Sequence, residues 1–136
     1  NNNNPEFIIY GSTASYYTHK VLVVFRWYFP SHTFRFVGKD PKVTERVEER
    51  SGTHRIPVVE STVSGWVVAD STFIFRWLEP QIPLVTNNHV LYPGTGFVRA
   101  IVALFEEYFD EWIPRLALHT RWNNEESAAY GARKLA

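Results

Sequence analysis

The sequence predicts an α/β domain with a mixed four-stranded sheet, followed by a partial all-helical domain. Up to residue 79, short apolar runs that suit strands alternate with amphipathic runs that suit helices. A stretch with several prolines follows, and beyond it apolar residues recur at helical spacing only. Because 45% of the 136 residues are hydrophobic and 16% are aromatic, the chain has the side chains to bury a core.

The first four elements alternate between strand and helix. Residues 7–10 form a compact apolar run that a glycine ends, which is typical of a buried strand. Over residues 16–28 apolar side chains recur at helical spacing, so we expect a helix there despite several β-branched residues. Residues 32–37 alternate polar and apolar side chains, as a strand does, and an Asp-Pro pair opens a polar helix over residues 42–50.

Three further elements complete this part. Residues 56–59 and 66–69 predict two strands that a small polar turn joins into an antiparallel hairpin. Residues 72–79 form an amphipathic run and predict a helix. The order is therefore β-α-β-α-β-β-α, and strands separated by helices favour parallel pairing. A mixed sheet with helices on both faces is the compact arrangement of these elements.

The rest of the chain is helical. Residues 80–93 predict a linker, so we expect one domain at residues 1–79 and a second at residues 94–136. A long helix over about residues 96–121 should kink at Pro114, and a short last helix follows it.

The composition excludes several classes of site. Lys plus Arg and Asp plus Glu both number 14, and no basic stripe stands out, so we expect no nucleic-acid surface. Without cysteine the chain has no disulfide, no thiolate metal site and no cysteine nucleophile. The five histidines show no ligand spacing, so we expect no metal. No apolar run is long enough for a membrane span, and no cleavable signal peptide is visible.

Pro57 falls inside a predicted strand, although proline cannot donate to a sheet ladder. A cis peptide bond would explain its place, because it would turn the backbone N–H and C=O of Ile56 away from the ladder. Those groups would then be able to pair with an extended peptide ligand, as an added strand would. The other explanation is an edge strand.

Asp70 and Ser71 stand where the next strand leads into a helix. A helix start offers unpaired N–H groups and a positive dipole end, which suit a carboxylate. Ser71 can add a hydroxyl donor, and Asp70 can accept from an ammonium group. Both residues could instead be a plain helix cap. A ligand with an α-carboxylate, an α-ammonium and an extended backbone would match these two residues and Ile56, and glutathione is such a molecule.

Five segments resemble the glutathione S-transferase family, in order and at family-like spacing. They are IIYG, SYYTHKV, THRIPVV, VVADSTFIFRWLE and FEEYFDEWIPRLALHTRW, and they cover nearly the whole chain. The resemblance implies a thioredoxin-like N-terminal domain. It also implies a truncated helical domain, because that domain of the family normally has several more helices.

The resemblance also assigns roles to individual residues. It implies that Asp70 and Ser71 hold the γ-glutamyl end of glutathione. The backbone of Ile56, next to Pro57, would hold the cysteinyl part. Arg55 occupies the usual basic position before the proline segment and would reach the glycyl carboxylate.

The residue that activates the thiol is left open. Ser15 aligns with the Ser/Cys position of the family at the start of the first helix, where a hydroxyl and the helix dipole favour a thiolate. Tyr10, at the end of the first strand, is the alternative, because some classes use a tyrosine there. Thr18 falls at the second polar site of the family's motif, and Ser12 is a remoter candidate. This sequence has Tyr16 where the family often has a proline after its Ser/Cys.

By resemblance, the protein would bind glutathione and transfer its thiolate to a small hydrophobic electrophile. It would act in detoxification as a cytoplasmic homodimer, without a metal, a nucleic acid or a membrane as partner. The alternative is a non-catalytic glutathione-binding or protein-interaction module with the same fold, which the short helical part and the missing loop proline favour.

Overall fold

The computed structural model describes residues 6–38, 40–82, 91–92 and 94–135. They belong to two compact units, Asn1–Leu91 and Tyr92–Ala136, and each unit is described by itself. Most of the predicted linker falls on residues that lie outside the described ranges.

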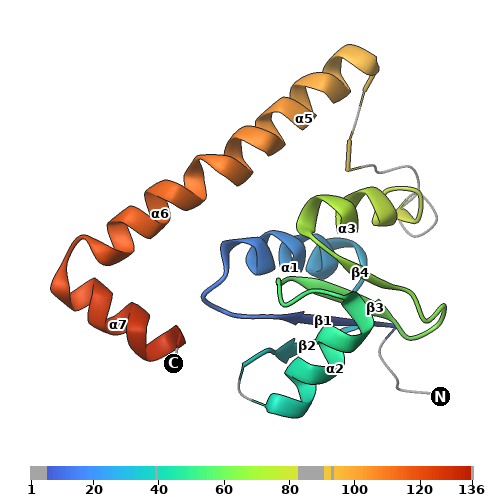
Figure 1. The fold of residues 1–136 in the computed structure, drawn as a ribbon. Helices are drawn as coiled ribbons and strands as arrows, with labels where there is room; N and C mark the ends of the chain where they lie inside the picture. Colours follow the sequence, from blue (N-terminus) through green and yellow to red (C-terminus); the bar gives the residue numbers. More distant parts are fainter. Residues whose placement is uncertain (1–5, 39, 83–90, 93, 136) are drawn as a thin grey trace. The chain divides into compact units, whose positions relative to one another are not determined.

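The first unit is a mixed four-stranded sheet between two layers of helices (Figure 1). Its elements are β1 (Phe7–Gly11), α1 (Tyr16–Tyr28), β2 (His32–Phe36), α2 (Pro41–Ser51), β3 (Val58–Ser61), β4 (Val67–Ala69) and α3 (Ser71–Leu78). In the sheet order β2-β1-β3-β4, β1 is parallel to β2 and antiparallel to β3, and β3 is antiparallel to β4. Helices α1 and α3 cover one face and α2 covers the other (Figure 1). The predicted fold class is confirmed, and every strand and helix of this unit ends within two residues of its prediction.

The face under α1 and α3 holds the larger apolar core. The ring of Phe7 in β1 packs edge-on against Phe25 of α1 and Trp77 of α3, with ring centroids 5.3 and 6.0 Å apart. The other buried apolar side chains on this side include Ile9, Val21, Val59, Ile74 and Leu78. Since burying one such side chain contributes about 1.5–3 kcal/mol, this core fixes both helices on the sheet.

The end of β1 and the start of α1 approach each other closely at Gly11. Thr18 of α1 is fully buried, and its Oγ1 accepts a hydrogen bond from the Ser12 N–H at 3.2 Å. A Cβ atom on Gly11 would lie 2.5 Å from Cγ2 and 2.6 Å from Oγ1 of Thr18. The approach therefore requires glycine, because any side chain would separate the strand end from the helix start.

The second unit consists of α5 (Gly96–Glu111), α6 (Ile113–Trp122) and α7 (Glu125–Leu135). The prediction of one long helix kinked at Pro114 is wrong in detail, because the chain forms two helices that meet at Trp112. Pro114 lies in the first turn of α6, where the missing N–H of a proline removes no helical hydrogen bond. None of the helices in the described ranges is both long and apolar enough to cross a membrane.

Replacing Gly11 with alanine should lower the free energy of unfolding by about 1–3 kcal/mol, as overpacking of a tight contact does. Thr18 cannot turn aside without breaking its bond to the Ser12 N–H. Gly96→Ala is the matched control, since nothing lies within 4 Å of the added Cβ there. Denaturant unfolding of both variants measures the difference. Equal stability of the two variants would show that the contact at Gly11 is not tight.

Candidate functional site

Three strand ends lie side by side at one edge of the sheet. Tyr10 pairs with Val58, and Val58 pairs with Ala69. Gly11 follows Tyr10, Pro57 precedes Val58, and Asp70 follows Ala69. These three residues are therefore neighbours across the ends of β1, β3 and β4. Because adjacent strands lie about 4.8 Å apart, this row spans roughly 10 Å, the length of an extended tripeptide.

At the β1 end of the row, Ser15 is the N-cap of α1. Its Oγ accepts a hydrogen bond from the Thr18 N–H at 3.3 Å. The Ser15 hydroxyl donates to no acceptor in the described part of the chain, so its proton is available for a hydrogen bond to a ligand. The first turn of α1 contains no acidic residue that would offset the positive end of the helix dipole. The position therefore favours an anion that accepts a hydrogen bond from Ser15.

At the centre of the row, the chain passes from α2 into β3 through a buried proline. The Ile56–Pro57 peptide bond is cis, and Pro57 is fully buried. The backbone N–H and C=O of Ile56 make no hydrogen bond within the described ranges, although Ile56 lies just before β3. The guanidinium of Arg55 is exposed and forms no ion pair with a described residue, whereas His54 Nδ1 lies 2.6 Å from Glu48 Oε1.

At the β4 end, Asp70 alone caps α3. Its Oδ1 accepts hydrogen bonds from the N–H groups of Thr72 and Phe73, at 2.9 and 3.4 Å. Oδ2 takes no part in these bonds and remains open to a donor. The backbone of Asp70 has φ +75°, a conformation that residues other than glycine rarely adopt. Such strain often marks a functional position.

Ser71 is the first residue of α3 and takes no part in the cap. The residue is only 5% exposed, yet its hydroxyl has no hydrogen-bond partner among the residues that the structure describes. The hydroxyl oxygen is not among the buried polar atoms left without a partner, so it keeps access to solvent and is open to a ligand. The plain helix-cap interpretation therefore accounts for Asp70 but not for Ser71.

The structure does not bring Tyr10 together with Ser15. Side chains alternate along β1, and Tyr10 points to the α2 face, where it packs with Val47 and Val58. Its hydroxyl donates a hydrogen bond to Glu60 Oε2 at 2.8 Å. Burial, together with this bond and the charge of Glu60, raises the pKa of Tyr10 to about 12. Its phenol is therefore committed to a structural contact on the face opposite α1.

Sequence reasoning missed the partners of Tyr10 on this face. Glu60 is buried in β3, and its carboxylate pairs with Arg46 and Arg50 of α2. The signal was available: an acid stands inside an apolar strand, and two arginines are spaced four residues apart on the preceding helix.

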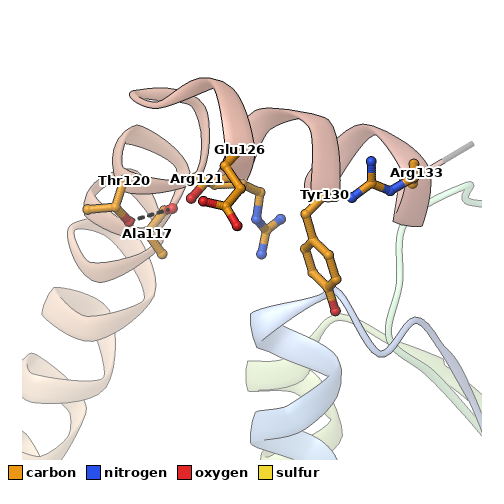
Figure 2. Close-up of a pocket in the computed structure, with 7 residues that line it drawn as sticks. Ala117, Thr120, Arg121, Glu126, Tyr130 and Arg133 are labelled. Carbon is orange, nitrogen blue, oxygen red and sulfur yellow. Dashed lines mark hydrogen bonds between the residues drawn. The ribbon is translucent and has the colours of Figure 1, made fainter.

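Two hollows lie away from the row of strand ends. A groove of about 390 Å³ is lined by residues of α1 and by Phe75 of α3, mainly through apolar groups, and Tyr16 and Val23 are among the α1 residues. A second hollow of about 710 Å³ separates α6 from α7 (Figure 2). It is lined by Ala117, Thr120, Arg121, Glu126, Ser127, Tyr130 and Arg133. None of the predicted site residues lines this second hollow. No group of three or more His, Asp or Glu side chains within the described ranges is placed to hold a metal ion.

No protein-family model matches the sequence, and no curated protein matches it either. Solved structures do match the fold. A Tau class glutathione S-transferase from mango, Mangifera indica, has 16% identity and a TM-score of 0.68, over 97% of this chain and 58% of that one. A glutathione transferase family member from Pseudomonas fluorescens Pf-5, solved with bound glutathione, has 18% identity and a TM-score of 0.67, over 95% and 66%. A glutathione S-transferase from Methylobacterium radiotolerans, solved with glutathione sulfonate, has 20% identity and a TM-score of 0.68, over 95% and 61%.

The alignments extend through both units of this chain, since they cover at least 95% of it, while the chain spans between 58% and 66% of the length of these three proteins. At such low identity the similarity shows the fold alone. The similarity covers both the thioredoxin-like sheet of the first unit and the helices of the second. The chain therefore has the fold of the glutathione S-transferases.

Proposed function

We propose that the row of strand ends binds glutathione. The observation that carries the proposal is the junction of β4 and α3, where Asp70 at φ +75° leaves Oδ2 unused and the hydroxyl of Ser71 has no bond to a described residue. A carboxylate of the ligand placed there would accept hydrogen bonds from this hydroxyl and from the helix start. Asp70 Oδ2 would accept from the ligand ammonium. Together these groups fit the γ-glutamyl end of the tripeptide.

The rest of the tripeptide follows the row toward α1 and α2. The free backbone groups of Ile56 would pair with the cysteinyl residue, as an added strand would. Arg55 carries a guanidinium without an ionic partner in the described ranges, and the glycyl carboxylate would supply one. The bound glutathione and glutathione sulfonate in two structures of the same fold support this choice of ligand.

We propose thiol activation by Ser15 as the chemistry of the site. The ligand thiol loses its proton to solvent, and the hydroxyl of Ser15 donates a hydrogen bond to the sulfur anion. The positive end of the α1 dipole adds to this stabilisation. The sulfur lone pair then forms a bond to the electrophilic carbon, whose leaving group departs with its bonding electrons. Tyr10 has no part in this step, since its hydroxyl is bonded to Glu60 on the other face.

The apolar groove between α1 and α3 supports a small hydrophobic electrophile as the second substrate, because Tyr16, which lines it, follows Ser15 in the chain. For the whole protein, we correspondingly propose a cytoplasmic homodimer that acts in detoxification. A non-catalytic glutathione-binding module with the same fold is the second candidate. It is favoured by the use of the Ser15 oxygen in an ordinary helix cap.

Ser71→Ala should raise the dissociation constant for glutathione by about 10- to 100-fold, since a hydrogen bond to a charged group contributes about 1.5–3 kcal/mol. The free variant should be at least as stable as the wild type, because the lost hydroxyl had no partner. Calorimetric titration and denaturant unfolding measure the two quantities. Ser64→Ala, on the turn after β3, is the control. A wild type without affinity for glutathione would refute the proposed function.

Ser15→Ala should slow conjugation of glutathione to an activated aryl halide at pH 6.5 by about 10- to 100-fold, through the lost hydrogen bond to the thiolate. The rise of kcat/KM with pH should move to higher pH, since a less stabilised thiolate has a higher pKa. Ser15→Asp is the matched variant. Its carboxylate keeps the helix cap but repels the thiolate, so stability should hold while the rate falls further. Tight glutathione binding by the wild type without any turnover would favour the non-catalytic module.

Tyr10 should remain protonated well beyond pH 10. In a protein labelled with ¹³C at tyrosine Cζ, its resonance should titrate with a midpoint of about 12. Tyr10→Phe identifies the signal. Because the folded-state pKa is raised, the protonated phenol stabilises the fold fully below pH 10, and this stabilisation fades as the pH rises toward 12. Completion of every tyrosine titration by pH 11 would contradict the buried bond to Glu60.

A further inference from the structure

We propose that Glu60 is a positioning residue that docks α2 on the sheet and thereby holds the glycyl end of the glutathione site in place. The inference rests on the proposed function, and it concerns residues that lie behind the site on the opposite face of the sheet. It is carried by the contacts of one buried carboxylate.

Glu60 joins three parts of the first unit. Its side chain is only 8% exposed, and it accepts the hydrogen bond of Tyr10 from β1. The other oxygen, Oε1, lies 2.9 Å from Arg50 Nη1 and 3.3 Å from Arg46 Nη2, both on α2. Arg50 also donates from Nη2 to the carbonyl of Gly65, in the turn that links β3 to β4, at 2.9 Å.

Helix α2 has a small apolar contact with the sheet. Its sequence PKVTERVEERS supplies two aliphatic side chains, Val43 and Val47, which pack with Tyr10 and Val58, and only Val47 is buried. The α1 and α3 helices, by contrast, bury several large apolar side chains each. The place of α2 on the sheet therefore depends strongly on the ion pairs to Glu60. Without the carboxylate, Arg46 and Arg50 would repel each other on one helix face.

The segment that follows α2 connects the helix directly to the proposed site, so the place of the helix sets the place of Arg55. Gly52 ends the helix in the left-handed conformation, at φ +69°. Thr53 Oγ1 accepts the N–H of Arg55 at 3.1 Å, and His54 pairs with Glu48 of the helix. These local bonds make the turn a continuation of α2. A displacement of the helix would therefore move Arg55 away from the glycyl carboxylate.

The γ-glutamyl end is held mainly through α3, although Val67 and Ala69 of β4 also pack against the cluster that contains Val47 of α2. Asp70 and Ser71 belong to the junction of β4 and α3, and α3 packs on the other face of the sheet. Loss of the Glu60 charge should therefore weaken contacts to the glycyl residue and spare those to the rest of the ligand. This selectivity separates positioning from general destabilisation.

The test compares glutathione with γ-glutamylcysteine, which lacks the glycyl residue, by calorimetric titration of the full chain. Glu60→Gln keeps the shape of the side chain and an acceptor for Tyr10, but removes the charge. We expect its dissociation constant for glutathione to rise about tenfold, with that for γ-glutamylcysteine unchanged within about twofold. In turnover, KM for glutathione should rise while kcat holds. Amide hydrogen exchange should quicken in α2 and not in α1.

Arg50→Gln serves as a second variant, since Arg50 is 39% exposed and its replacement leaves the core intact. It should show the same selective loss, even where Glu60→Gln fails to fold. Lys42→Gln is the control, because Lys42 is an exposed cation of α2 without an ion pair in the described ranges. Parallel weakening of both ligands, or an unchanged preference for glutathione, would overturn the role of Glu60 alone. A wild type that binds neither ligand would overturn the proposed function and this inference together.

Discussion

The pairing of β1 with β3, and of β3 with β4, is the constraint on which the site depends. Tyr10, Val58 and Ala69 lie in one line across the sheet, so the three chain segments beyond them meet at one edge. A slip of one residue would exchange the two faces of β1 and would turn Phe7 out of the core under α1. The same register brings Gly11 against Thr18 and fixes the start of α1 at this edge.

The two faces of the sheet contribute in different ways. The α1 and α3 face is apolar, and it leaves two helix starts at the edge, one capped by Ser15 and one by Asp70. The α2 face is held by a buried carboxylate between two arginines and a phenol. Removing one partner of a buried ion pair leaves an uncompensated charge, whereas an apolar core loses only the contacts of the side chain that is changed. The α2 side of the site is therefore the more sensitive to single charges.

The sequence predicts those features of the fold that depend on residues close together along the chain. The element order, the cap at Asp70 and the place of Ser15 before the first helix follow from periodicity and from residue types within a few positions. The contact between Tyr10 and Glu60 joins residues 50 positions apart. An acid inside an apolar strand signals a buried partner, but no residue near it in the sequence identifies that partner as Tyr10. The helix boundary at Trp112 was missed because proline is tolerated in a first helical turn, so Pro114 marks a start as readily as a kink.

The junction of β4 and α3 carries a backbone strain that the fold alone does not require. A glycine in place of Asp70 would relieve the backbone at φ +75°, but it would remove the carboxylate that caps α3. The hydroxyl of Ser71, beside Asp70, makes no bond to a described residue. Backbone strain persists where another interaction recovers its cost. A ligand with a carboxylate and an ammonium would recover this cost, because the carboxylate meets the Ser71 hydroxyl and the ammonium meets Asp70 Oδ2, two groups that the cap leaves unused.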